Sequence, residues 1–123
     1  MDMQTVASLF TLFSGQQDTQ TYGPLLTAAV LEVTQSLRTG ADVQDARLCY
    51  LAAALANLRY TQLTGAREHM LATYAGTAAV SVDEKGRLGF AQRLAEGYRS
   101  LCRELLQDTA FVFLTVGGWG DVQ

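Results

Sequence analysis

Apolar residues recur every three or four positions over most of the chain, a spacing that predicts helices with one buried face. Four helices are predicted, over residues 3–14, 24–38, 43–64 and 88–107. The signals at their ends agree with these bounds, because a glycine follows each of the first three and the only proline, Pro24, opens the second. The third helix is apolar nearly all round, so we expect it to be buried among the others.

Polar residues mark the starts of two of these helices. Asp2 is expected to cap the first and Asp42 the third, where Asp45 also favours the positive end of the helix. Leu55 lies in a leucine seam at the centre of the third helix, and we expect its side chain to be almost fully buried. Four alanines of the same helix allow other helices to approach closely: Ala52, Ala53, Ala54 and Ala56.

Two short segments predict strands instead of helix. Residues 77–82 are rich in Thr, Ser and Val, and residues 110–116 form a β-branched and aromatic run. Residues 83–86 predict a turn that ends in glycine, and the composition of the tail, residues 117–123, predicts flexibility. The expected fold is therefore mainly α: one domain, residues 1–123, built as a four-helix antiparallel assembly with a small two-stranded β element.

The composition favours a small structural or binding protein over an enzyme. Hydrophobic residues make up 49% of the chain, which is enough for a core, and charged residues only 17%, against a usual ~25%. So thinly charged a surface suggests that other subunits cover part of it. The net charge of −3 argues against a nucleic-acid binder. One histidine and two cysteines leave little material for catalysis, so no catalytic residue, metal site or cofactor is expected.

The two cysteines and the amino-terminal residues indicate a reducing compartment. The chain begins without the basic region and the cleavage site that are typical of a signal peptide. Its longest apolar stretch, residues 48–58, is far shorter than the ~20 residues that cross a bilayer. We therefore expect a cytoplasmic protein in which Cys49 and Cys102 are reduced and buried, a disulfide between them being the less simple alternative.

Isolated polar residues that could suggest chemistry have simpler structural explanations. His69 has no second ligand at metal-binding spacing and is expected to be a surface or packing residue. Asp83 and Glu84 lack the other ligands of a cation loop. Arg47 and Arg59, on one helix, are better explained as ends of a packed helix than as a phosphate site. The tail glycines lack the lysine and the helix of a phosphate loop.

The C-terminal apolar run is the feature that a monomer explains least well. Only one other predicted strand could pair with it, and the ribbon would leave an edge open to another chain. Self-association by strand addition is the favoured interpretation, and a covered hairpin within one chain is the alternative. The residues predicted to form the oligomer or partner interface are Phe111, Val112, Phe113, Leu114, Val116 and Trp119.

The order of the predicted elements supports a resemblance to a known group of proteins. Residues 25–63 form a Leu/Ala-rich helix pair joined at residues 39–42, and residues 79–118 hold a strand, a charged amphipathic helix and an aromatic strand. This layout resembles small head-tail connector, adaptor or head-completion proteins encoded in structural gene clusters of tailed phages and prophages of Gram-positive bacteria. It covers roughly two-thirds of the chain and leaves residues 16–22 and 65–78 unplaced.

The resemblance implies a helical adaptor without enzymatic activity that binds as a ring beneath the portal. Its partners would be other copies of the chain and the portal or tail proteins, first in the host cytoplasm and then in the virion. We therefore expect a structural adaptor of virion assembly that oligomerises and bridges larger components. One alternative is a cytosolic helical protein-binding or regulatory module, possibly dimeric. Another is a small enzyme or ligand carrier with a pocket between helices.

Overall fold

The structure, a computed structural model, describes the backbone of residues 1–74 and 82–111 and the side chains of residues 1–67 and 85–111. Four helices follow one another, α1 (Met3–Ser14), α2 (Gly23–Gln35), α3 (Ala46–Tyr74) and α4 (Val82–Leu101), and a short 3-10 turn, η1 (Arg103–Leu105), comes last. The prediction of a mainly α fold is confirmed. The predicted two-stranded β element is not seen, since these two ranges contain no strand.

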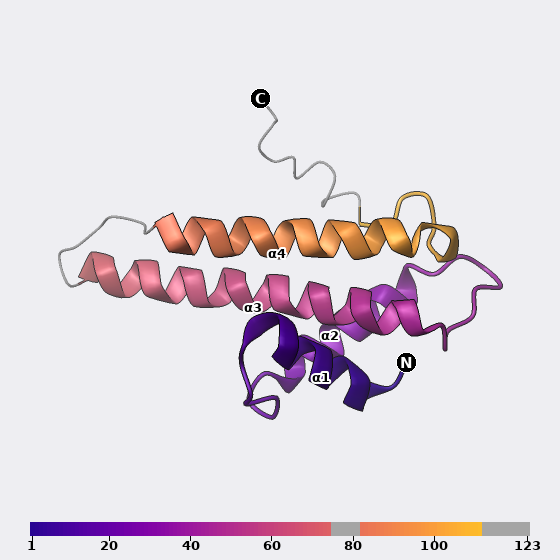
Figure 1. The fold of residues 1–123 in the computed structure, drawn as a ribbon, viewed down its shortest axis with the longest axis horizontal. Helices are drawn as coiled ribbons and strands as arrows, with labels where there is room; N and C mark the ends of the chain where they lie inside the picture. Colours follow the sequence, from indigo (N-terminus) through magenta and orange to yellow (C-terminus); the bar gives the residue numbers. More distant parts are fainter. Residues whose placement is uncertain (75–81, 112–123) are drawn as a thin grey trace.

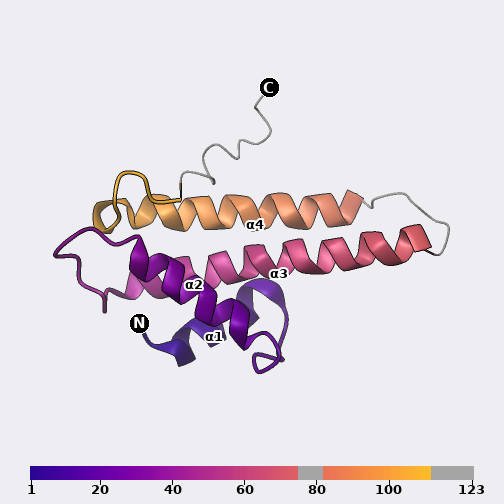
Figure 2. The same ribbon diagram turned by 180° about the vertical axis from the view of Figure 1, so that it is seen from behind.

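The long helix α3 is the central element of the fold. Helix α4 runs antiparallel beside it over most of its length, and α1 and α2 pack on the opposite side (Figure 1). Both views show α1 and α2 against the N-terminal half of α3 only, so the far end of the α3–α4 hairpin extends beyond them (Figure 2). The nearly all-apolar surface that the sequence gives to α3 is explained by these three neighbours.

The start and end of α1 agree with the predicted bounds. The Asp2 carboxylate accepts a hydrogen bond from the backbone N–H of Gln4, and Gly15 ends the helix with a φ of 77°. This left-handed conformation is the one that glycine adopts without strain. Val6 and Phe10, one turn apart, are fully buried, so the local pattern was sufficient to place this helix.

Helix α2 ends at Gln35, three residues before the predicted end at residue 38. The chain leaves the helix because Leu37 forms an antiparallel bridge with Leu106. Two backbone hydrogen bonds complete this connection. The N–H of Arg38 donates to the carbonyl of Leu105 (3.0 Å), and the N–H of Gln107 donates to the carbonyl of Ser36 (2.9 Å). Pairing with a segment nearly 70 residues away thus replaces the last helical turn.

Helix α3 differs from the prediction at both ends. It begins at Ala46, and the Asp45 carboxylate caps it by accepting from the backbone N–H of Arg47 (3.0 Å). The predicted cap, Asp42, instead accepts from Gln44 in the preceding turn. The predicted stop at Gly65 is also wrong, because the helix continues to Tyr74. One interior glycine costs a helix only ~1 kcal/mol, which packing against α4 offsets.

Helix α4 begins six residues earlier than predicted. It starts at Val82, so the predicted turn at residues 83–86 is helical. Val82, the last residue of the predicted strand 77–82, is helical as well, and the other residues of that strand lie outside the described ranges. Glutamate, lysine and arginine are good helix formers, and they outweigh the single Gly86.

The C-terminal end of α4 also differs from the prediction. The helix ends at Leu101 instead of residue 107, and η1 replaces its last turn. Leu101, the last residue of the helix, is 53% exposed, whereas Ala95 is fully buried. Of the predicted strand 110–116, Ala110 and Phe111 lie in a turn, and the remaining residues fall outside the described part, as does the tail.

The core is centred on the N-terminal half of α3. Eight of its consecutive positions, 51–58, are all buried, and Leu55 is fully inaccessible to solvent, as predicted. Cys49 and Cys102 are buried and carry free thiols, in agreement with the expectation from the sequence. Because α3 contacts all three other helices, a change at its centre affects the whole fold.

Candidate functional site

An open groove lies where the end of α1 meets the middle of α3 and the first half of α4. Its volume is about 570 Å³, within the range of ~300–1,000 Å³ typical of ligand pockets. Each of the three helices contributes to its walls. The lining residues are Leu12, Phe13 and Ser14 from α1, Asn57, Tyr60, Thr61 and Thr64 from α3, and Arg87, Phe90, Ala91 and Leu94 from α4.

Two large apolar side chains form the rim of this groove. Leu12, near the end of α1, is 74% exposed, and Phe90 of α4 is 71% exposed. The guanidinium of Arg93 lies 5.0 Å from the centre of the Phe90 ring, a cation–π arrangement. These are the two most exposed large hydrophobic residues in the described part of the chain, and both border the same groove.

Most polar groups in the groove form hydrogen bonds within the chain. The hydroxyl of Thr61 donates to the carbonyl of Asn57 (2.8 Å), and that of Thr64 donates to the carbonyl of Tyr60 (3.0 Å). The Tyr60 hydroxyl accepts from the side-chain amide of Gln16 (3.2 Å). These hydroxyls are therefore engaged in holding α3 and the loop after α1.

Asn57 is the exception among these polar groups. The residue is only 6% exposed, yet its side-chain amide has no hydrogen-bond partner among the described residues. No fully enclosed side-chain nitrogen or oxygen atom lacks a partner in that part of the chain. The amide of Asn57 therefore retains access to the groove that it lines, where one donor–acceptor group is left for an occupant.

Aromatic contacts hold the walls of the groove in place. The Tyr60 ring meets Phe10 and Tyr22 edge to face, with ring centroids 5.6 and 5.0 Å apart. Phe13 stacks against Tyr98 of α4 at 5.8 Å, which ties α1 to α4 across α3. Such pairs add about 0.5–1.5 kcal/mol each beyond the area that they bury, so the groove exists before anything binds.

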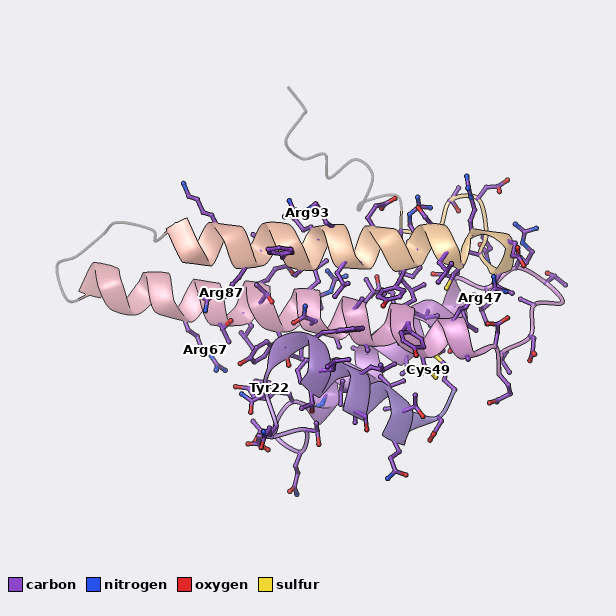
Figure 3. The ribbon with its side chains drawn as sticks, in the orientation of Figure 1. Tyr22, Arg47, Cys49, Arg67, Arg87 and Arg93 are labelled. Atoms are coloured by element: carbon purple, nitrogen blue, oxygen red, sulfur yellow. The ribbon has the colours of Figure 1, made fainter. Side chains whose placement is uncertain are left out.

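Two arginines of α4 lie in or near the groove. Arg87 extends from α4 toward α3, whereas Arg93 projects from the outer side of α4 (Figure 3). No carboxylate is among the described lining residues, although the chain as a whole carries a net charge of −3.

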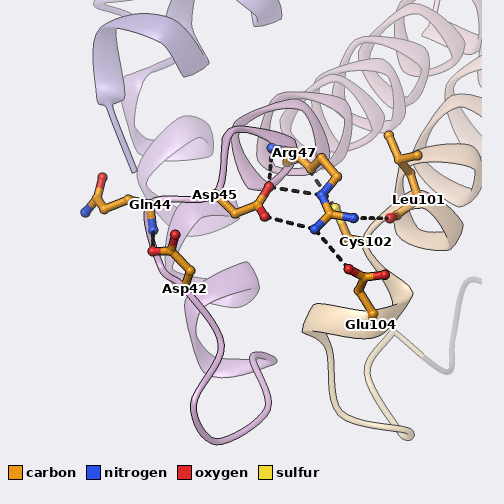
Figure 4. Close-up of polar contacts among 7 residues, drawn as sticks. All are labelled: Asp42, Gln44, Asp45, Arg47, Leu101, Cys102 and Glu104. Carbon is orange, nitrogen blue, oxygen red and sulfur yellow. Dashed lines mark hydrogen bonds and ion pairs between the residues drawn. The ribbon is translucent and has the colours of Figure 1, made fainter.

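A second polar cluster joins the start of α3 to the end of α4 (Figure 4). The Arg47 guanidinium forms an ion pair with Asp45 (2.9 Å) and another with Glu104 (3.3 Å), and donates to the carbonyl of Leu101 (3.3 Å). Its hydrogen bonds lower the pKa of the Asp45 carboxyl to about 2, and Asp45 in turn raises the pKa of Arg47. This cluster fastens two helix ends, as expected for an arginine at the end of a packed helix.

Arg59, the other arginine considered in the sequence, lies farther along α3. It forms an ion pair with Glu32 of α2 at 3.3 Å. This contact joins two helices and lies 12 residues along α3 from the Arg47 cluster. The two arginines therefore connect different pairs of elements and do not converge on one site.

The Cys102 thiol is buried beside the Arg47 cluster. Its Sγ donates to the backbone carbonyl of Arg47 at 3.4 Å, and burial raises the thiol pKa to about 11. A thiol that stays protonated at neutral pH is a poor nucleophile. Cys49 is also buried, and neither cysteine lines the groove.

The structure describes only one of the predicted interface residues. The side chain of Phe111 is 5% exposed and belongs to the chain's own core, so it is not available to a partner in this conformation. Its φ of 57° is in the left-handed region, which bulky residues rarely adopt. Val112, Phe113, Leu114, Val116 and Trp119 lie outside the described ranges. His69 is in α3, and its side chain is also outside the description.

The described residues contain neither a cluster of metal ligands nor a helix that could span a membrane. No group of three or more His, Cys, Asp or Glu residues lies close enough together there to hold a metal ion. None of the helices in that part combines the length and the apolar character that a membrane span requires.

Comparison with known proteins identifies no relative. No protein-family model, no curated protein and no solved structure matches the chain.

Proposed function

We propose that this protein is a non-enzymatic structural adaptor of phage or prophage virion assembly, which connects head and tail by oligomerising and bridging larger components. The observation that supports this best is the rim of the groove, where Leu12 and Phe90 expose most of their apolar surface. Contiguous exposed apolar surface in a folded protein typically marks an interaction site. The low fraction of charged residues, 17%, also favours a surface that other proteins cover.

The shape of the α3–α4 hairpin supports a bridging role. At 1.5 Å per residue, the 29 residues of α3 extend about 43 Å, and α1 and α2 lie beside only one half of it (Figure 2). The chain therefore presents two regions to its surroundings, the groove next to α1 and the projecting end of the hairpin. An adaptor that connects two components needs two such regions.

The chemistry of the described groups favours binding over catalysis. The hydroxyls of Thr61 and Thr64 are bonded to backbone carbonyls, and the Cys102 thiol is buried with a raised pKa. Catalytic nucleophiles need the opposite setting, with an accessible group and a nearby base. These contacts are those of a structural framework.

A pull-down from infected or induced cells tests the assignment. A tagged chain should recover portal or tail proteins. The double variant Leu12→Ser, Phe90→Ser should lose them, whereas the control Leu31→Ser, 55% exposed on α2 and away from the groove, should keep them. Recovery of a metabolic enzyme in place of virion components would contradict the proposal.

Self-association is tested by removing residues 112–123, a truncation that keeps the buried Phe111. The helical signal in circular dichroism should remain, and sedimentation should show a smaller assembly than that of the full chain. If the shortened chain does not fold, the segment belongs to the core of the monomer. If it folds and assembles as before, the predicted C-terminal interface is wrong.

A cytosolic protein-binding or regulatory module is the second candidate, because it would use the same groove. Stable dimers and recovery of a single regulatory partner, without virion proteins, would favour it. The volume of the groove, about 570 Å³, is the observation that favours a ligand carrier. The exposure of the rim residues, Leu12 and Phe90, argues against a carrier, because a small ligand in this groove would remain largely in contact with water.

A further inference from the structure

We infer that the exposed face of α4 is a dimer interface, at which two copies of this chain pack their α4 helices antiparallel to each other. This inference rests on the oligomerisation in the proposed function, for which it names a surface distinct from the C-terminal segment. Three properties of α4 carry it: an exposed apolar stripe, the positions of the glycines within that stripe, and the charges at its edge.

A stripe of exposed residues runs along the outer side of α4. Its members are three or four positions apart, so they share one face of the helix. We call these residues the α4 stripe: Gly86, Phe90, Arg93, Gly97 and Leu101. Phe90 is 71% exposed and Leu101 is 53% exposed, and Arg93 between them projects from the outer side of α4 (Figure 3). Large apolar side chains exposed along one helix face are typical of an interaction surface.

The large and small residues of the α4 stripe are spaced to fit a second copy of the same stripe. Two antiparallel helices related by a two-fold axis bring together residues that lie equally far on either side of that axis. With the axis midway between positions 93 and 94, Phe90 of one copy lies opposite Gly97 of the other. The same register places Leu101 opposite Gly86. A Cβ added at either glycine would meet nothing within 4 Å, so each glycine leaves space for the large side chain opposite.

The charges at the edge of the α4 stripe agree with this register. Arg93 lies near the axis, and Glu96, held by Arg99, lies on the same flank of the helix as Arg93. Two-fold symmetry keeps this flank of both copies together, so Arg93 of each copy lies beside Glu96 of the other. A carboxylate can accept hydrogen bonds from two arginines at once. A parallel pair would instead bring the two Arg93 side chains together and leave the glycines facing each other.

The size of this interface predicts a weak dimer. Helix α4 has 20 residues and extends about 30 Å, and with a width of about 10 Å its face covers about 300 Å² of each copy. Stable interfaces cover about 800 Å² per partner, and smaller ones are typical of transient complexes. We therefore expect a dissociation constant of about 10–100 µM, and one poorly fitting side chain should be enough to prevent association.

Sedimentation equilibrium of the full chain measures the dimerisation. Gly97→Gln should weaken it by about tenfold or more, because the new side chain fills the space that Phe90 of the second copy needs. Glutamine is a better helix former than glycine, so unfolding of α4 would not explain this loss. The matched control is Gly23→Gln, at another glycine with open space, which lies at the start of α2 and should leave dimerisation unchanged.

Engineered cysteines test the antiparallel register. Arg93→Cys places a thiol near the axis in each copy, so mild oxidation should join two chains by a disulfide. Ser100→Cys is the control, because Ser100 is exposed on the same side of α4. In the antiparallel dimer its two copies lie about 20 Å apart along the helix axis, beyond the reach of a disulfide. Cys49 and Cys102 are buried and should not react.

Three results would overturn the inference. If the unchanged chain stays monomeric well above the expected dissociation constant, α4 is not a dimer interface. If Gly97→Gln associates as strongly as the unchanged chain, another surface joins the copies. If Ser100→Cys forms disulfides as readily as Arg93→Cys, the helices do not pair antiparallel in this register.

The pull-down and these measurements fail independently. Gly97 does not line the groove, so Gly97→Gln leaves the walls of the groove unchanged. If virion proteins are recovered but the copies do not associate through α4, the inferred interface is wrong and the adaptor role stands. If the α4 dimer forms as expected but no virion protein is recovered, the interface stands and the assignment to virion assembly is wrong.

Discussion

Replacement of Leu55 by alanine should destabilise the fold strongly. The side chain is fully buried at the centre of α3, and removal of three carbons from such a site costs about 2–5 kcal/mol. The cost depends on how well the neighbours can fill the space. The leucines one turn away on the same face of α3, Leu51 and Leu58, are also buried, so close packing limits how far they can move into the cavity. We therefore expect a loss within this range, about 3 kcal/mol.

Urea denaturation followed by circular dichroism measures this loss. With an m-value of about 1.5 kcal/mol/M, a loss of about 3 kcal/mol lowers the midpoint by about 2 M. The matched control is Leu31→Ala, the same substitution on the exposed side of α2, which should change stability by less than about 0.5 kcal/mol. A loss below about 1 kcal/mol for Leu55→Ala would show that α3 is not the centre of the core.

Three further predictions concern the thiols, the helix caps and the glycines. Cys102, with a pKa of about 11, and the buried Cys49 should react with a thiol reagent at pH 8 only after unfolding, when two free thiols should be counted. Asp45→Asn keeps a capping side chain but removes its charge. The folded chain lowers the pKa of the Asp45 carboxyl from 3.8 to about 2, so the unchanged chain should lose stability as the pH falls from about 4 to 2. The Asp45→Asn variant should show a smaller loss of stability in melts over the same pH range. Gly97→Ala should raise the free energy of unfolding by about 0.5–1 kcal/mol, because the added methyl group meets open space on the surface of α4. Gly15→Ala should lower it by about 1 kcal/mol, because alanine is strained at a φ of 77°. Melting temperatures that shift in the same direction for both variants would contradict this prediction.

Features determined by neighbouring residues could be predicted from the sequence. The Asp2 cap, the Gly15 stop and the proline at the start of α2 act within one helical turn, and the structure contains all three. The burial of Leu55 followed from the periodic seam of α3. In each case, the physical cause and its effect lie close together along the chain.

Features determined by distant residues could not be predicted in this way. Helix α2 ends early because Leu37 pairs with Leu106, and α3 continues past Gly65 because α4 packs beside it. Both outcomes depend on contacts between segments far apart in the chain, which local propensity does not record. The early start of α4 has a local cause that the glycine of the predicted turn obscured.

The groove combines both kinds of information. Its rim was not predictable, because Leu12 and Phe90 lie off the buried faces of their helices and become neighbours only in the fold. Asn57 could be noticed in the sequence, because the stretch 48–58 contains only one other residue with a polar group, Tyr50. The amide of Asn57 forms no hydrogen bond with a described side chain, and it reaches solvent through the groove that it lines. Whether such a position of a core helix faces a groove depends on the helices that pack around it, and the residues next to Asn57 in the sequence do not determine that packing.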